Sequence, residues 1–254
     1  MRLRKPASLR GRVPFLTDSA IEAESDLLLA EYALGRRAVL APPVPIENIL
    51  ELHLQLNFSV MDLRAELGVP NVLGALWVDT ATVGVDRSLD PVVNPAREGR
   101  YHFTLAHEVG HWRLHRRHFL ADHDQAKFAG GHADAPSYVC RDGSKAPEET
   151  QANRFAACLL MPRAMLRAAW QEQQGDDQPL VLPDLCATRP ELLTQEIARR
   201  NFEPVTKEDA DDMILEGAAR PLAQRFRVSP WTMRIRLEEL GLLCRKPPEP
   251  GLFS

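Results

Sequence analysis

Residues 103–115 of the chain, FTLAHEVGHWRLH, contain the pattern H-E-x-x-H at His107, Glu108 and His111. Residues four apart lie on one face of a helix, about 6 Å apart along its axis, so both imidazole rings can bind the same metal ion. Glu108 lies about 100° around the helix from His107, beside such an ion rather than among its ligands. A carboxylate there can take a proton from a water that the metal has acidified. The pattern therefore predicts a zinc site with Glu108 as its catalytic base.

A five-residue pattern also arises by chance, and histidines are common on the exposed faces of helices. The neighbouring residues argue against chance, because they are apolar enough to be buried: Phe103, Leu105, Ala106 and Val109. Burying two histidines without a partner is unfavourable, so a shared metal ion is the simplest explanation. His115 lies about 12 Å along the axis from His107, too far to bind the same ion. We interpret His115 and His118 as solvated residues at the end of the helix.

The third protein ligand is expected from a second helix, PEETQANRFAACLL, which begins at Pro147. Glu148 and Glu149 lie in its first turn, where the helix dipole favours the ionised carboxylate that zinc requires. Two acids at a helix start can also be there for the dipole alone, and helical phase does not separate them. Asn153, four residues after Glu149, can accept the free N–H of a liganding histidine. This spacing favours Glu149 as the ligand and Asn153 as a supporting residue.

The two motifs FTLAHEVGHWRLH and E-x-x-A-N-R-F-A-A-C-L-L-M-P resemble those of the ImmA/IrrE family of metallopeptidases, which pair with helix-turn-helix repressors. The resemblance covers about residues 73–162 and continues weakly to Leu243. It implies a zincin-like core that binds Zn²⁺. It also implies the roles of four residues, with zinc bound by His107, His111 and Glu149 and base catalysis by Glu108.

The pattern of apolar residues predicts an α+β fold, with a small sheet and active-site helices followed by a helical C-terminal region. We divide the chain into an N-terminal arm and helix (1–40), a zincin-like metallopeptidase core (41–170) and a C-terminal region (171–254). The expected elements are helices at 17–34, about 47–55 and 147–160, a strand within 56–63, and a hairpin within 73–89 that turns at 79–82. Residues 118–146 are expected to be a long loop, and residues 171–211 show only weak patterning.

The C-terminal region contains a helix-turn-helix-like unit at about 216–243, with two or three short helices and a break at 227–229. In that interpretation Arg234 and Arg236 contact phosphates, and Trp231 or Thr232 contacts bases. The apolar residues of the segment are also sufficient to explain it by packing alone. The net charge of −4 gives no general attraction to nucleic acid, and direct DNA binding is not expected.

Composition places the protein among ordinary globular chains, with 44% hydrophobic and 26% charged residues. No apolar stretch has the length of a secretory signal or a membrane span. The four cysteines form no C-x-x-C pair, so we interpret them as reduced core or surface thiols. These features together favour a cytoplasmic location.

The leading functional hypothesis is a zinc endopeptidase that cleaves a regulatory protein, such as a helix-turn-helix repressor or an antitoxin. Two alternatives remain, namely a DNA-binding regulator with a structural zinc and a module that sequesters a repressor and has a vestigial site. Glu108 argues against a structural site, which needs four ligands and no adjacent base. The donor for the developing oxyanion stays open among six residues: Tyr101, His102, His123, His132, Tyr138 and Arg141.

Overall fold

The computed structural model describes residues 13–120, 136–141, 146–200 and 206–247. The chain divides into two compact units. The first comprises residues 1–39 and 44–160, and the second residues 40–43 and 161–254. Among the described helices, none is both long and apolar enough to cross a membrane.

The first unit begins with helix α1 (Asp18–Gly35), which starts where the sequence predicts. Thr17 caps it, since its side chain accepts a hydrogen bond from the backbone N–H of Ala20 at 3.2 Å. The helix expected near residues 47–55 is also present, as α2 (Ile46–Asn48) continuing into the π-helical turn η1 (Ile49–His53). The sequence therefore predicted both helices correctly, and the first of them also by its capping residue.

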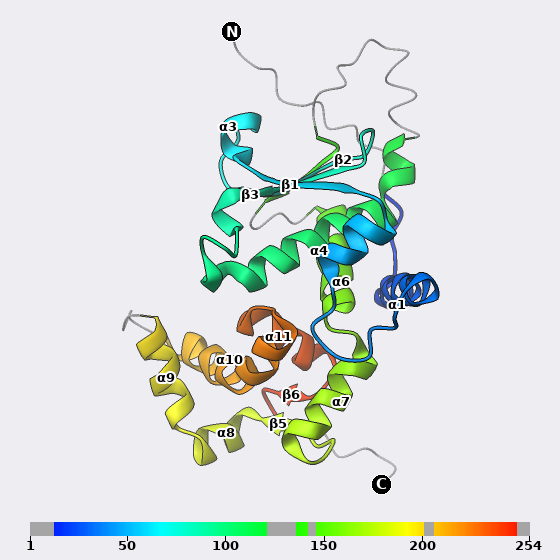
Figure 1. Ribbon diagram of the computed structural model, residues 1–254. Helices are drawn as coiled ribbons and strands as arrows, with labels where there is room; N and C mark the ends of the chain where they lie inside the picture. Colours follow the sequence, from blue (N-terminus) through cyan, green and yellow to red (C-terminus); the bar gives the residue numbers. More distant parts are fainter. Residues whose placement is uncertain (1–12, 121–135, 142–145, 201–205, 248–254) are drawn as a thin grey trace. The chain divides into compact units, whose positions relative to one another are not determined.

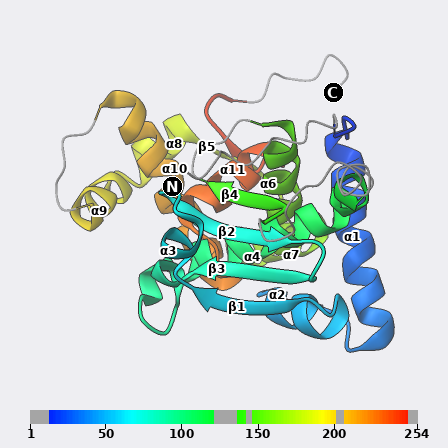
Figure 2. The ribbon, with the colours of Figure 1, turned by 90° about the horizontal axis from the view of Figure 1, so that it is seen from above.

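A four-stranded sheet forms the centre of this unit, in the order β1-β3-β2-β4 (Figures 1 and 2). Its strands are β1 (Asn57–Met61), β2 (Val72–Trp77), β3 (Thr82–Asp86) and β4 (Tyr138–Arg141). Strands β2 and β3 form the predicted hairpin, in which Trp77 pairs with Thr82. Strand β1 runs parallel to β3, and β4 runs antiparallel to β2.

Strand β4 corrects the expectation of a continuous loop over residues 118–146. It is only four residues long, too short to show a clear alternation by itself, and it depends on pairing with β2. Val139 packs on the face of the sheet that helix α3 (Leu63–Leu67) covers. Tyr138 and Cys140 consequently point to the opposite face, because neighbouring side chains of a strand alternate. The rest of that segment, at 121–135 and 142–145, lies outside the described residues.

Helices α4 (Glu98–Leu114) and α6 (Pro147–Leu160) carry the two motifs, and α6 has the bounds that the sequence predicts. Helix α4 lies on the face of the sheet opposite α3 (Figure 1). Gly110 lets α6 approach α4 closely, because a Cβ there would be 3.2 Å from both the Cα and the carbonyl oxygen of Ala152. A side chain at this position would require the two helices that hold the candidate ligands to shift by at least a few tenths of an ångström.

The second unit is mostly helical. Its helices are α7 (Arg163–Gln174), α8 (Leu182–Thr188), α9 (Glu191–Arg199), α10 (Lys207–Phe226) and α11 (Pro230–Glu239), and the short strands β5 (Leu180–Val181) and β6 (Leu243–Cys244) pair in parallel. Weak patterning within 171–211 therefore concealed two helices, α8 and α9. Helix α10 is continuous despite Pro221, and the predicted break follows it, where Arg227 has a φ of 53° and Ser229 caps α11.

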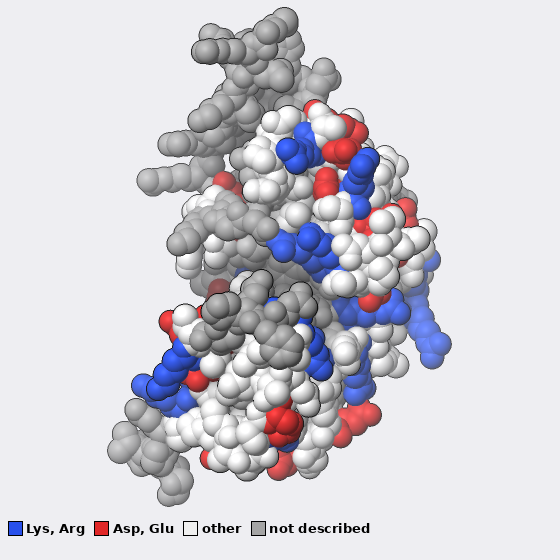
Figure 3. Space-filling view, turned by 90° about the vertical axis from the view of Figure 1, so that its left-hand side faces the viewer, with Lys and Arg blue, Asp and Glu red and all other residues white. Residues whose placement is uncertain are grey.

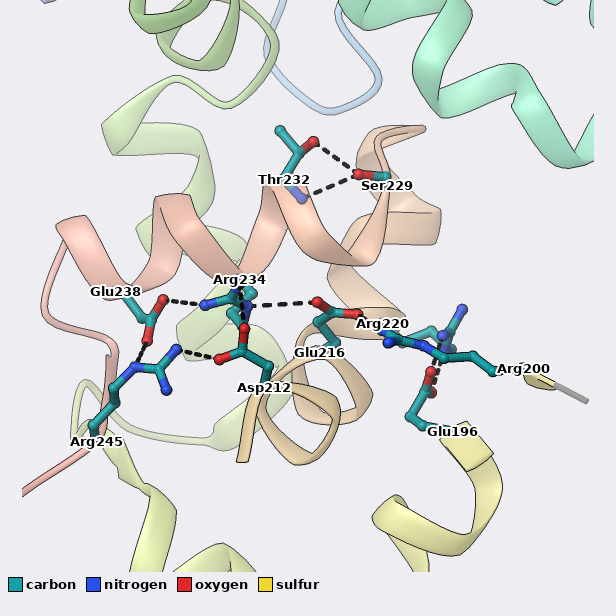
Figure 4. Close-up of polar contacts among 10 residues, drawn as sticks. All are labelled: Glu196, Arg200, Asp212, Glu216, Arg220, Ser229, Thr232, Arg234, Glu238 and Arg245. Carbon is teal, nitrogen blue, oxygen red and sulfur yellow. Dashed lines mark hydrogen bonds and ion pairs between the residues drawn. The ribbon is translucent and has the colours of Figure 1, made fainter. Parts of the chain in front are cut away.

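The structure corrects the interpretation of Arg234 and Arg236 as phosphate contacts, and Figure 4 shows Arg234 among its acidic partners. Arg234 is only 6% exposed and forms ion pairs with Asp212 at 3.2 Å and Glu238 at 2.8 Å. Arg236 is fully buried and donates a hydrogen bond to the carbonyl oxygen of Met161. Both arginines therefore stabilise the second unit internally. On the face of the described chain that Figure 3 shows, basic side chains are interspersed with acidic ones.

Candidate metal centre

Three predicted ligands come together between α4 and α6. The Nε2 atoms of His107 and His111 are 3.0 Å apart. The Glu149 carboxylate lies 3.3 Å from Nε2 of His107 through Oε2 and 3.2 Å from Nε2 of His111 through Oε1. Nitrogen and oxygen ligands of one tetrahedral zinc ion are about 3.4 Å apart, given bonds of about 2.0–2.2 Å. The three donors therefore fit a single zinc ion.

The other ring nitrogen of His107 is held by Asn153, as the sequence predicts. Its Nδ1 lies 2.9 Å from the Asn153 amide oxygen, which can only accept a hydrogen bond. A proton is then on Nδ1, so Nε2, which faces Glu149, is the nitrogen that can bind a metal. Such support is typical of histidines that bind metals.

His111 is oriented by His115, which corrects the interpretation of His115 as a solvated residue. His115 is completely buried, and its Nδ1 lies 3.0 Å from Nδ1 of His111. Its Nε2 donates to the Gln151 side-chain oxygen at 3.0 Å, so its Nδ1 must accept from His111. Gln151 in turn donates to the carbonyl oxygen of Pro14. This series of hydrogen bonds leaves Nε2 of His111 available to bind a metal. His118, in contrast, is exposed, as the sequence predicts.

We predict that His115→Phe weakens zinc binding about 10- to 100-fold, the usual effect of losing a partner that orients a metal ligand. Phenylalanine fills a similar volume but cannot accept the proton of His111. The measurement is competition with a chelator, and the matched control is His118→Phe at the exposed position. Equal zinc affinity of both variants would show that the histidine pair does not orient the ligand.

Glu108 is buried beside the ligands without a hydrogen-bond partner for either carboxylate oxygen among the described residues. Its carboxylate occupies the space left by Gly74 of β2, where a Cβ would lie 2.5 Å from Oε1. Burial raises the pKa of the carboxyl to about 8; His107 lowers the pKa and Glu149 raises it. An unpartnered carboxylate in a dry site is costly unless something else binds there, so this observation also fits a site built around a metal and a water.

The charges of the ligands suit a cation. Burial lowers the pKa of His111 to about 3, so its ring is neutral. Burial alone would raise the pKa of Glu149, but hydrogen bonds with His107 and His111 outweigh it and hold the pKa at about 2. Burial likewise lowers the pKa of His107, yet contacts with Cys140 and Glu149 raise it well above its usual value. Without a metal, a proton on Nε2 of His107 therefore faces the Glu149 carboxylate, and a zinc ion that binds there displaces this proton.

Two residues at the site were missed by sequence reasoning. Gly74 carries no chemical signal, and Cys140 was interpreted only as a reduced core or surface thiol. Donor atoms of Cys140, His107 and Glu149 all lie within 4.8 Å of one another. Burial raises the pKa of the Cys140 thiol and a hydrogen bond with His107 lowers it, with a net increase.

Among the candidate oxyanion donors, Tyr138 is the one that the structure places against a ligand. Its ring stacks on His111 with centroids 4.3 Å apart, and its hydroxyl donates to the carbonyl oxygen of His115. The hydroxyl of Tyr101 donates to Glu47 at 2.7 Å. His123, His132 and the side chain of Arg141 lie outside the described residues.

We predict that Glu149→Gln weakens zinc affinity strongly, whereas Glu148→Gln has almost no effect. The Glu149 carboxylate contacts both histidines, and a neutral amide loses the charge that binds the cation. Chelator competition on both variants measures the difference. The reverse ranking would show that the other glutamate is the ligand.

A helix with two buried histidines four residues apart and a buried glutamate, packed between a small sheet and a second helix that carries Glu149, is typical of a metallopeptidase site. The family model Peptidase_M78, described as the IrrE N-terminal-like domain, matches residues 92–238, more than half of the chain. The chain therefore belongs to this family, which is of the zinc metallopeptidase type. The resemblance to ImmA/IrrE proteins and the α+β fold are confirmed. A search of curated protein sequences found no match to this chain.

Proposed function

We propose that the protein is a zinc-dependent endopeptidase that cleaves a regulatory protein in the cytoplasm, such as a helix-turn-helix repressor or an antitoxin. The observation that carries this proposal is the meeting of His107, His111 and Glu149 beside the buried, unpartnered carboxylate of Glu108. A purely structural zinc site has no use for such a base.

When bound, zinc acidifies a water and polarises the carbonyl of the scissile peptide bond. The protein supplies the rest of the chemistry. A carboxylate oxygen of Glu108 takes the proton of the attacking water and later delivers it to the nitrogen of the leaving amine. Asn153 and His115 hold the two histidine rings in the tautomers that keep Nε2 available. The close packing of α4 and α6 keeps bulk water away from these groups.

Strand β4 suggests how a protein substrate reaches the site. It is an outer strand of the sheet, and both Tyr138 and Cys140 project from it toward the ligands. An extended peptide can add to such an edge through backbone hydrogen bonds. We propose that the substrate binds there as an unfolded or flexible segment. The choice of a repressor or antitoxin rests on the resemblance to ImmA/IrrE proteins.

The test is co-incubation of the protein with the repressor encoded next to it, with zinc and with a chelator. Cleavage fragments that appear only with the metal, identified by mass spectrometry, would support the proposal. Binding of the repressor without cleavage would favour the alternative of a sequestering module. Binding of operator DNA by the protein alone would favour the DNA-binding regulator.

A further inference from the structure

Cys140 lies at the metal centre because of the register of the sheet. In the pairing of β4 with β2, Cys140 is opposite Gly74. Val139 packs on the far face, against the core formed by Leu63, Val72 and Ala75. The thiol therefore projects toward α4, where the two histidines are.

The thiol joins residues that already form a ligand set. His107, Cys140 and Glu149 are the group of potential metal ligands found among the described residues, with donor atoms within 4.8 Å of one another. A sulfur ligand and a nitrogen ligand of one zinc ion are about 3.6 Å apart, so the donor atoms of this group, which does not include His111, are at most about 1.2 Å farther apart than zinc requires. Thiolate is also a soft ligand that zinc binds well.

Glu108 gives a second, independent indication that this side of the site faces a ligand position. Gly74, the partner of Cys140 across the sheet, leaves the space in which the Glu108 carboxylate lies. That carboxylate is fully buried and has no hydrogen-bond partner among the described residues. The Cys140 thiol and the Glu108 carboxylate thus both lie beside the position at which a metal-activated water would have to bind for catalysis.

We propose that Cys140 is a fourth protein ligand, which closes the metal centre and holds the enzyme in a latent form. The inference rests on the proposed function, since it concerns the same zinc site. On binding, the S–H bond breaks, a metal–sulfur bond forms and the proton is released to solvent, without electron transfer. A zinc site with four protein ligands has no open position for water. Catalysis would then require the metal–sulfur bond to break and the thiolate to take up a proton from solvent, which would leave a position for water beside Glu108.

The other three cysteines have different surroundings. Cys158 is buried in α6, Cys186 is exposed on α8, and Cys244 is partly buried in β6. None of them belongs to a ligand group among the residues that the structure describes. Cys186 therefore provides a matched control, because its replacement leaves the metal centre untouched.

The experiment replaces zinc by cobalt(II) in the full-length protein and records its absorption spectrum. A thiolate ligand gives a sulfur-to-cobalt charge-transfer band in the near ultraviolet, which needs no substrate. We expect the band in the parent and in Cys186→Ser, and its loss in Cys140→Ser and Cys140→Ala. The cleavage rate of the two Cys140 variants should rise above that of the parent, because water gains the fourth position.

Cobalt that binds to the parent without a sulfur band would overturn the inference about Cys140 and leave the peptidase proposal intact. Persistence of the band in both Cys140 variants would also overturn it. Failure of cobalt and zinc to bind at all would refute the metal centre itself, and with it both proposals. Using two variants ensures that a folding defect of one does not decide the result.

Discussion

Glu108→Gln is expected to lower the rate of substrate cleavage by at least about 10²–10⁴-fold while leaving zinc binding intact. The side chain keeps its size but can no longer accept the proton of the attacking water. Its oxygens make no hydrogen bond to the described residues, so no structural contact is lost. The replacement also removes a buried carboxylate, and folding should not suffer.

Three measurements on each protein make this result interpretable: fragment formation by mass spectrometry, zinc content, and the circular dichroism spectrum. Glu148→Gln is the matched control, because that glutamate is only partly buried and lies outside the ligand set. Loss of zinc together with activity would place Glu108 among the ligands. Unchanged cleavage would refute the mechanism proposed here. If neither protein cuts a repressor that both bind, sequestration becomes the better explanation.

Local sequence signals were sufficient for the helices that build the site. Thr17 caps α1, and Pro147 and Pro162 enclose α6 together with its apolar stripe. The predicted ligands also depend on local spacing, four residues between His107 and His111 and four between Glu149 and Asn153. Because a helix has a fixed period, such spacings give side-chain positions directly. The structure brings these residues together, and their roles remain to be tested by experiment.

Features that depend on distant partners could not be predicted from the sequence. Strand β4 is four residues long and is defined by pairing with β2, which precedes it by more than 60 residues. The position of Cys140 follows from that register. His115 is buried, and the residue that accepts a hydrogen bond from its Nε2, Gln151, lies on another helix. Its spacing from His111, again four residues, was the one local signal that could have revealed this role.

The arginines of α11 show the same limitation. The spacing of Arg234 and Arg236 is compatible with a helix that binds DNA and also with a buried ion-pair network. The two interpretations differ only in the residues that contact the arginines. Asp212 lies 22 residues before Arg234, on α10, and the two meet because α10 and α11 pack together. Helix α10 also continues through Pro221. A proline is costly inside a helix but tolerated where packing on neighbouring helices compensates.

Replacing both His107 and His111 with alanine is expected to reduce bound zinc from one ion per chain to none. The double variant keeps Glu149 but loses two of the three donors that meet at about the spacing of a single ion. Zinc should then no longer stabilise the protein. An ion present at about 1,000 times its dissociation constant adds roughly 4 kcal/mol to the free energy of unfolding of a protein that binds it only when folded.

The parent's melting temperature should therefore rise on addition of zinc, and that of the double variant should not. His118→Ala, at an exposed position on the same stretch of chain, is the control and should behave like the parent. Elemental analysis gives the stoichiometry, and thermal unfolding with and without zinc gives the stabilisation. Stoichiometric zinc in the double variant would rule this site out, since the remaining carboxylate and thiol are too few to hold the ion tightly. Loss of zinc without loss of fold would instead show that α4 and α6 pack by their apolar contacts and that the ion serves the chemistry alone.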